Sequence, residues 1–284
     1  MAKIVTFYHD IEQNIDSTAD PKICMEMVKE FLNLEKKYNI PVTYNVVGKL
    51  FKEQPDLIKQ ITEAGQEVAF HSYNHQPDWN PRYYSNEIDL CKKVSSLPLG
   101  YRSPRSKWNG ITLRKLREQG FLWSAEGGAN KEPYFIYKDL VRLPISGDDW
   151  PLQTGAMNIE KWVEQFRGLL EERLYVAFGS HDSVTSFSPE ERLRAWEMVL
   201  RVAVESKVLC VTFSEAADLY RRAAQEKGIK APYRNLENKT ATGRRVIPVS
   251  AVNFDFLSRW YVSINRWFFT TKRKLLRFRH TKSE

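Results

Sequence analysis

The sequence is poor in cysteine. It contains three in 284 residues, and Cys24, Cys91 and Cys210 are too far apart to form a CxxC pair. A disulfide framework and a thiolate zinc site are therefore not indicated, and a reducing compartment suits these residues. The first residues also lack the apolar segment and cleavage pattern of a secretory signal, because a β-rich run follows Met1-Ala2-Lys3 directly. We therefore expect a cytoplasmic protein, and the sequence shows no internal repeat.

Acidic residues are scarce at the C-terminal end. Residues 228–284 contain 13 Lys and Arg residues and three acids, a net charge of +10, whereas the other 227 residues carry 30 basic and 32 acidic side chains, a net charge of −2. The chain thus combines a nearly neutral body with a cationic tail. We expect a folded domain over residues 1–227, a linker rich in turn-forming residues over 228–253, and a basic amphipathic C-terminal helix or tail over 254–284.

The expected tail carries bulky apolar residues among its arginines and lysines. Several of them follow helical i, i+3, i+4 spacing: Leu257, Trp260, Tyr261, Ile264, Phe268, Leu275 and Phe278. Such a stripe bordered by cations is typical of a helix lying on an anionic membrane surface, such as the inner membrane face, and it is too charged to cross a bilayer. An amphipathic helix packed on the body or on a second subunit fits equally well. Nucleic-acid binding is less favoured, because the bulky apolar residues form a stripe.

The body has the composition of a globular domain, since 42% hydrophobic residues allow one substantial core. Short apolar runs alternate with longer amphipathic stretches, which predicts an α/β fold with a mostly parallel sheet, open or closed into a barrel. Strands are expected near residues 3–8, 41–47, 66–71, 99–103, 121–125, 140–145, 174–179 and 208–212. Helices are expected near residues 21–38, 55–64, 82–95, 110–119, 158–172, 189–205 and 213–226.

Four of the five histidines lie in polar clusters at or after the ends of expected strands. His71 and His75 are four residues apart, and such a pair can bind one metal ion if the backbone turns after the strand. Two solvent-facing loop histidines are the alternative. Asp10 and Glu12 are two residues apart, so their carboxylates share a face if the chain stays extended, although either could simply end the strand. Together the four side chains indicate a divalent metal site with open positions, as hydrolytic sites have.

The other polar clusters, Arg102, Asp148-Asp149 and His181, also lie at or just after the carboxyl ends of expected strands. Active sites of α/β proteins are assembled by the loops after the carboxyl ends of the strands. This placement favours an enzyme.

In chain order these clusters resemble the motifs of the NodB-type polysaccharide deacetylases, carbohydrate esterase family 4. The run HSYNH at 71–75 is similar to the second motif in its longer-spaced form. Three further runs resemble the third, fourth and fifth motifs: Arg102-Ser-Pro104, Asp148-Asp149-Trp150 and Phe178-Gly-Ser-His181-Asp182. The first motif, usually TFDD, appears as Thr6-Phe-Tyr-His-Asp-Ile-Glu12, which resembles a D-x-[DE] form. The resemblance covers residues 3–226 and implies a distorted (β/α) barrel of the NodB type.

The resemblance also implies a role for each motif residue. Glu12, His71 and His75 would bind one divalent ion, with zinc favoured over cobalt, manganese or nickel. Asp10 would be the general base, oriented by Arg102, and His181 the general acid, held by Asp148 or Asp149. An alternative register makes Asp10 the metal ligand and puts His9 near the base position.

The resemblance implies substrate contacts as well. Trp150 would form a wall of the acyl pocket, with core packing as its alternative role. Arg105 and Tyr101 would also contact the substrate. A backbone N–H near Arg105 would bind the oxyanion. Gly179 departs from the family pattern, in which a leucine commonly lines the acyl pocket, so a roomier pocket is expected.

These features lead to three functional hypotheses. The first is a metal-dependent hydrolase that removes the N-acetyl group from an N-acetylhexosamine in a glycan or lipid-linked sugar. The second keeps the chemistry and changes the amide to a sugar formamide or a small cyclic amide. The third is a non-catalytic glycan-binding or membrane-associated protein, against which the complete set of metal-binding residue types argues.

Overall fold

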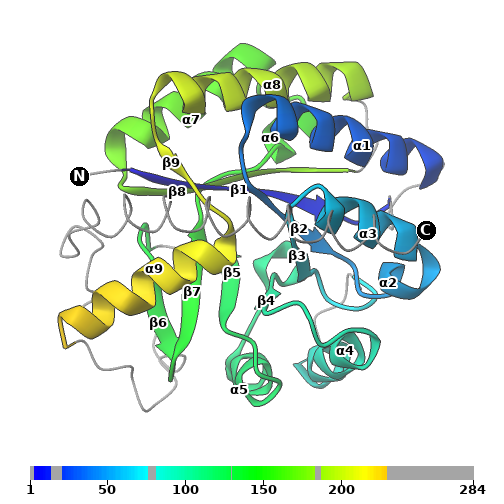
Figure 1. Cartoon of the computed structure of the whole chain (residues 1–284), viewed down its shortest axis with the longest axis vertical. Coiled ribbons are helices and arrows are strands. Elements are labelled where there is room, and N and C mark those ends of the chain that lie inside the picture. Colours follow the sequence, from blue (N-terminus) through cyan, green and yellow to red (C-terminus); the bar gives the residue numbers. More distant parts are fainter. Residues whose placement is uncertain (1–2, 14–20, 76–80, 129, 183–186, 229–284) are drawn as a thin grey trace, which may run out of the picture.

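The structure is a computed structural model that describes residues 3–13, 21–75, 81–128, 130–182 and 187–228 (Figure 1). The expected tail at 254–284 lies outside these residues, as does the expected linker beyond Gly228. The boundary between body and tail therefore stays a prediction.

The described part of the chain forms one nine-stranded sheet. Its order is β6-β7-β5-β4-β3-β2-β1-β8, and β9 pairs with the N-terminal part of β1. All pairs are parallel except the hairpin of β6 and β7. The strands are β1 (Ile4–Ile11), β2 (Val42–Val46), β3 (Glu67–Phe70), β4 (Gly100–Tyr101), β5 (Trp123–Gly127), β6 (Tyr134–Tyr137), β7 (Leu140–Ile145), β8 (Tyr175–His181) and β9 (Leu209–Cys210).

The sheet curls until its two ends meet. Just after β7, Gly147 forms a parallel bridge with Phe178 of β8, and the Gly179 N–H donates to the Gly147 carbonyl over 3.1 Å. A Cβ at residue 147 would lie 2.7 Å from the Phe178 ring, so glycine permits this approach. The result is the distorted (β/α) barrel expected from the sequence, with a short and irregular closure.

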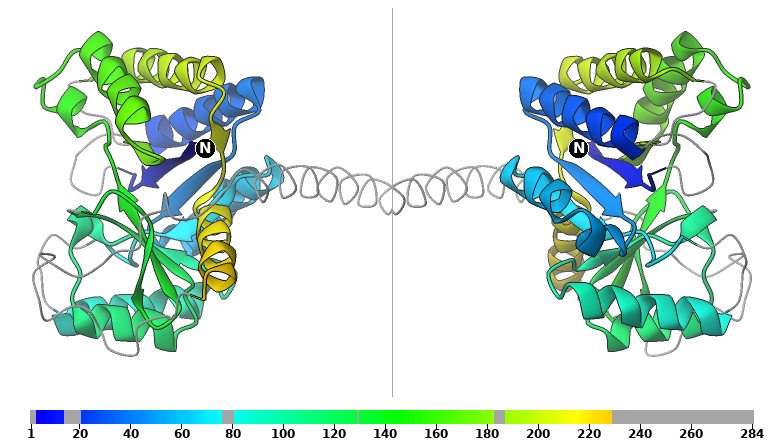
Figure 2. Two further views of the ribbon diagram at one scale, coloured as in Figure 1. Left: turned by 90° about the vertical axis from the view of Figure 1, so that its left-hand side faces the viewer. Right: turned by 90° about the vertical axis from the view of Figure 1, so that its right-hand side faces the viewer.

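Helices cover the outside of this barrel. In Figures 1 and 2, α1, α7 and α8 lie together over β1 and β8, while α4 and α5 lie on the opposite side and α9 crosses near β5 and β7. The helices are α1 (Pro21–Tyr38), α2 (Leu50–Glu53), α3 (Pro55–Glu63), α4 (Pro81–Val94), α5 (Gly110–Glu118), α6 (Trp150–Gln153), α7 (Ile159–Glu172), α8 (Pro189–Glu205) and α9 (Phe213–Glu226), with a 3₁₀ turn, η1 (Pro104–Ser106).

The core is deepest around β1, in which all eight residues are buried. Strands buried on both faces are typical of parallel sheets covered by helices. On one face of β1, Phe7 packs between Phe166 of α7 and Trp196 of α8. On the other face, Tyr8 stacks on Phe213 at the start of α9. This packing holds from both sides the strand that carries Asp10 and leads directly into Glu12.

Every expected strand and helix is present. Ser188 and Glu191 form a capping box at the start of α8, and Thr212 and Glu215 form another at the start of α9. The sequence interpretation missed β6, α2 and α6, which have four residues each. Elements this short do not complete the apolar period on which the prediction depends.

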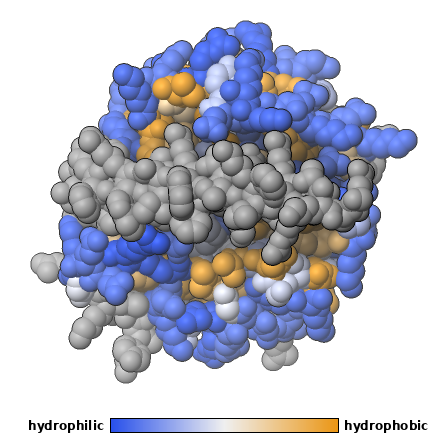
Figure 3. Space-filling model, in the orientation of Figure 1, coloured by the Kyte–Doolittle hydropathy of each residue, from blue (hydrophilic) through white to orange (hydrophobic). Residues whose placement is uncertain are grey.

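Most of the described surface visible in Figure 3 is hydrophilic, with smaller apolar areas. Within the described ranges, no helix combines the length and apolar character that crossing a membrane requires.

Candidate active site

The polar clusters meet at the carboxyl ends of the strands. Glu12 follows β1, His71 follows β3, and Arg102 follows β4. Asp149 lies after β7, and His181 ends β8. The curled parallel sheet brings these five ends, which are far apart in sequence, to one edge.

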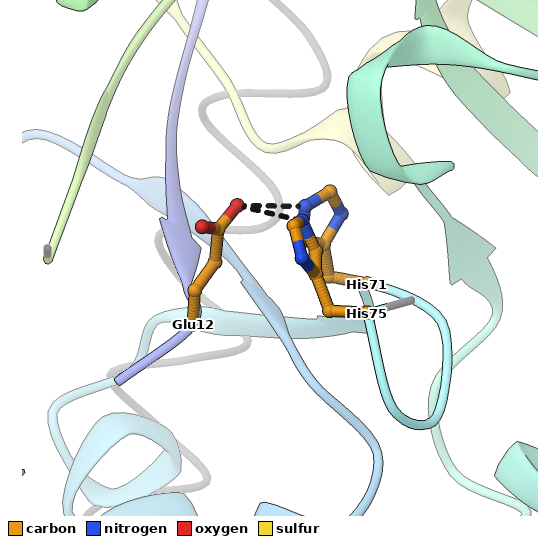
Figure 4. A group of neighbouring side chains, drawn as sticks. All are labelled: Glu12, His71 and His75. Atoms are coloured by element: carbon orange, nitrogen blue, oxygen red, sulfur yellow. Dashed lines mark hydrogen bonds and ion pairs between the residues drawn. The ribbon is translucent and has the colours of Figure 1, made fainter. Parts of the chain in front are cut away.

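Glu12, His71 and His75 point toward one another (Figure 4). Glu12 Oε1 lies 3.1 Å from His71 Nε2 and 3.0 Å from His75 Nε2. The imidazole rings are 4.9 Å apart between centroids, and both are buried. Three atoms that can each bind a metal ion therefore converge on one point.

The contacts of His71 indicate that a cation fits between these atoms. Its Nδ1 lies 3.0 Å from the Arg102 carbonyl, which can only accept, so Nδ1 carries a hydrogen. With the hydrogen of Nδ1 directed at that carbonyl, Nε2 faces the Glu12 carboxylate, and these two atoms can lie this close only with a proton or a metal cation between them. The donor set of two imidazoles and one carboxylate thus fits a divalent metal ion.

Glu12 is held by its backbone as well as by the histidines. The buried carboxylate of Asp182 accepts the N–H of Glu12 over 2.8 Å and that of Gln13 over 3.0 Å. Burial alone would raise the pKa of Glu12, but the hydrogen bonds with His71 and His75 outweigh burial and hold this pKa well below its usual value. Glu12 is therefore ionised, as a metal ligand must be.

Asp10 is buried beside this group. Its Oδ2 accepts from Arg102 Nε over 2.7 Å, and its Oδ1 accepts from Asn45 Nδ2 over 2.8 Å. Burial alone would raise the pKa of Asp10, but the Arg102 charge, together with the nearby imidazoles, outweighs burial and lowers the pKa. A buried, ionised carboxylate held on both oxygens is suited to accept a proton at a defined place.

His181 lies across β1 from Asn45. In the strand register, Asp10 is the partner of both residues. The Nδ1 atom of His181 pairs with Asp149 Oδ1 over 2.6 Å, and its Nε2 faces Asp10 Oδ2 at 3.6 Å. Burial would lower the pKa of His181, but the Asp149 carboxylate raises it to about 10. His181 is therefore protonated at neutral pH.

The structure also decides between the two aspartates expected to hold His181. Asp149 is the partner, and it further accepts from Ser180 Oγ, the His181 N–H and the buried Arg192 guanidinium. Asp148 instead accepts the Trp150 N–H, so its expected contact with His181 is wrong. Burial would raise the pKa of Asp149, but the charges of His181 and Arg192 lower it strongly.

The expected substrate-contact residues differ in exposure. Trp150 is 61% exposed next to Asp149, so it is available to a ligand rather than packed in the core. Arg105 is exposed on η1 with a φ of 54°. Tyr101 is fully buried and meets Phe121 edge to face, which corrects its expected contact with substrate.

His9 points to the other side of the sheet from Asp10. Its ring stacks on Phe31 of α1, and its Nε2 lies 2.7 Å from the buried carboxylate of Glu35. The register that places His9 near the base position therefore does not fit this structure.

Sequence reasoning missed two residues of the site, Asn45 and Arg192. Asn45 is a polar residue inside the buried strand β2, and an amide at such a position is a signal that could have been used. Arg192 lies on α8 and is buried, and it donates hydrogen bonds to Asp149 and to the His181 carbonyl. Because these partners are far from Arg192 in sequence, the residues around it give no signal of this role.

Comparison with known proteins finds similarity to one family. Residues 13–122 match the polysaccharide deacetylase family model. Over this segment the chain is similar to the polysaccharide deacetylases. The matched segment starts directly after Glu12 and contains His71, His75 and Arg102.

The individual proteins that the chain resembles are distant in sequence. A peptidoglycan deacetylase of Helicobacter pylori is 24% identical over 245 residues, covering 67% of this chain and 82% of the relative. A Mycobacterium smegmatis protein assigned as a polysaccharide deacetylase aligns with a TM-score of 0.66 at 22% identity, covering 87% of this chain and 96% of the other. The PuuE allantoinase aligns with a TM-score of 0.62 at 17% identity, covering 76% and 90%. Both of these solved structures share the fold of this chain.

Proposed function

We propose that the chain is a metal-dependent N-deacetylase that hydrolyses the acetamide of an N-acetylhexosamine in a glycan or lipid-linked sugar. One observation carries the proposal. The three candidate ligands Glu12, His71 and His75 converge beside a buried ionised Asp10, and Nε2 of the protonated His181 lies 3.6 Å from Asp10 Oδ2. Amide hydrolysis needs this combination, because water must lose a proton and the departing amine must gain one.

Glu12, His71 and His75 would hold the metal ion. We propose zinc, because two imidazoles and one carboxylate with an open position are the ligand set of catalytic zinc in hydrolases. Cobalt, manganese and nickel are the alternatives that metal analysis distinguishes. A divalent ion held there would supply Lewis acidity, which polarises the amide carbonyl and lowers the pKa of water.

Asp10 would accept the proton of the attacking water. Arg102 and Asn45 each hold one of its oxygens, so its orientation is set before substrate arrives. His181 would donate a proton from Nε2 to the leaving nitrogen, since its Nδ1 is held by Asp149. The base would thus begin the reaction ionised and the acid protonated, which is the pairing that general acid–base catalysis uses.

The exposed Trp150 would bind the acyl group or a sugar ring, because an indole face offers a large apolar surface beside the acid. Arg105 and the backbone near it, on the loop after Arg102, would contact the substrate on the base side.

The test is a release assay on the full chain, with acetate and formate measured separately. Substrates are N-acetylhexosamine oligosaccharides, lipid-linked N-acetylhexosamine, an N-formyl sugar and a small cyclic amide. We expect acetate release that chelation abolishes and zinc restores. Formate release alone or opening of the cyclic amide would replace the acetyl assignment. Glycan binding without any hydrolysis would overturn the enzyme proposal.

We further propose that the protein acts in the cytoplasm, at the inner membrane face, through residues 254–284. The charge and apolar stripe of that segment support the proposal. The test compares the full chain with a chain ending at residue 253 in sedimentation with vesicles. Binding of the full chain to vesicles containing phosphatidylserine, but not to pure phosphatidylcholine vesicles, is expected. Equal sedimentation of both chains would contradict it.

A further inference from the structure

The loop that carries the two candidate ligand histidines has an unfavourable backbone. Ser72 has a φ of 56° and His75 a φ of 52°, and neither is glycine. Non-glycine residues in this region cost about 1–2 kcal/mol each. Within the loop, Ser72 Oγ accepts the His75 N–H over 3.0 Å. The conformation that brings the two imidazoles together therefore needs support from outside the loop.

Glu87 of α4 supplies that support. Its carboxylate accepts the Tyr73 N–H over 3.0 Å, the Asn74 N–H over 2.5 Å and Asn74 Nδ2 over 2.9 Å. Tyr73 and Asn74 are the two residues between Ser72 and His75. Both carboxylate oxygens take part, so Glu87 fixes the middle of the loop in position and in orientation.

The burial of Glu87 makes this contact obligatory. The residue is 1% exposed, and a buried carboxylate is costly unless hydrogen-bond donors replace its water. Three donors from the loop do so. If the loop left this conformation, Glu87 would lose these donors. The Glu87 side chain and the histidine loop therefore stabilise each other.

We propose that Glu87 is a positioning residue for the metal site and sets its affinity by holding His71 and His75 in the binding arrangement. Glu87 has no part in the proposed acid–base chemistry and touches none of the three candidate ligand side chains in the contacts described. The inference rests on the proposed function, because it presumes that these histidines bind metal. Loss of a residue that orients metal ligands costs about 10–100-fold in metal affinity.

Glu67 is a matched control for Glu87. It lies at the opposite end of β3 from His71, and its carboxylate also accepts from three donors: Thr43 Oγ1, Ser214 N and Ser214 Oγ. Neutralising either glutamate removes a carboxylate with three hydrogen bonds. Of these two glutamates, Glu87 is the one that contacts the loop from His71 to His75. A general loss of stability would therefore appear in both Glu87→Gln and Glu67→Gln, whereas a specific loss of metal affinity would appear in Glu87→Gln and not in Glu67→Gln.

The experiment measures zinc affinity of the metal-free full chain by competition with a chromophoric chelator, alongside thermal unfolding without metal. In Glu87→Gln an amide NH₂ replaces one acceptor oxygen opposite the loop donors, and we expect the zinc Kd to rise about 10–100-fold. Glu67→Gln should keep the wild-type Kd within twofold even where its melting temperature falls. Asn74→Ala removes one donor and should give a smaller rise, and it provides the test if Glu87→Gln does not fold.

The outcomes separate the two proposals. If the wild type binds zinc and both Glu87→Gln and Asn74→Ala keep the wild-type Kd, the metal site would stand, whereas the role of Glu87 would be overturned. An equal rise in Kd for Glu67→Gln would also overturn it, because the effect would then follow stability. A wild-type chain that binds no divalent metal would overturn the metal site and, with it, this inference.

Discussion

The ring of Tyr8 lies against the backbone of Gly179, so close that a Cβ at residue 179 would be 2.3 Å from Tyr8 Cζ. Gly179 is the position at which the resemblance implies a leucine in the acyl pocket, and Tyr8 of β1 occupies the space that a Cβ at this position would enter. The roomier pocket stays a prediction. The Tyr8 hydroxyl donates to the Gly147 carbonyl over 3.3 Å, and the Arg102 guanidinium lies 5.0 Å from the ring centre. Tyr8 therefore links β1, the strand that carries Asp10, to the segment just before Asp149.

This contact predicts strong coupling between the two positions. Gly179→Ala should lower the free energy of unfolding by about 1–3 kcal/mol, because the added methyl overpacks against the ring. In Tyr8→Ala the ring is gone, so adding Gly179→Ala should cost much less than it does in the wild type. Denaturant unfolding of the four proteins of this double-mutant cycle measures the coupling. Additive losses would show that the ring does not occupy this space.

Asp149 should control the pH range of activity through His181. The Asp149 carboxylate keeps the pKa of His181 at about 10 against the opposite effect of burial. Asp149→Asn removes that charge, so the pKa of His181 should fall and the alkaline limb of kcat/KM should move to lower pH. Asp148→Asn is the matched control, because Asp148 contacts the Trp150 N–H rather than the imidazole. An alkaline limb at the same pH in Asp149→Asn and wild type would argue that another group sets it.

A stability effect is expected far from the site, at Glu132. Burial raises the pKa of Glu132 to about 7. Between the pKa of an unfolded glutamate and 7, the folded chain holds a proton at this residue that the unfolded chain has lost, so stability should fall as pH rises through that range. Glu132→Gln removes the titration. It should therefore stabilise the protein more at pH 8 than at pH 5.

Denaturant unfolding at the two pH values measures this difference. Replacing the exposed Glu118 by Gln is the control and should change little at either pH. The same gain at both pH values in Glu132→Gln would contradict a raised pKa at this residue.

The fold was largely predictable because its strands and helices have strong apolar patterns. The exception in β1 is instructive, since the strand was expected to end at residue 8 and continues to Ile11. His9 and Asp10 look like the polar end of a strand, yet both are buried, because Glu35 and Arg102 pair with them. Those partners are 26 and 92 residues away in sequence. No local pattern contains that information.

The site was predictable where residue type and spacing decide the chemistry, as for Glu12, His71 and His75. It was not predictable where two adjacent residues share a type. Only the three-dimensional arrangement shows that Asp149, rather than Asp148, meets His181. Asn45 and Arg192 became visible through strand register and helix packing, which bring them to Asp10 and Asp149.

The most direct test of the account is the zinc content of the wild type, Asp10→Asn and Glu12→Ala, measured together with acetate release from N-acetylhexosamine substrates. Glu12 is the proposed ligand and Asp10 the proposed base, so the two variants should fail in different ways. We predict about one zinc per chain in wild type and Asp10→Asn, strongly reduced zinc in Glu12→Ala, and acetate release falling at least about 100-fold in both variants. A wild-type chain without metal, or an Asp10→Asn variant that releases acetate at the wild-type rate, would contradict the account.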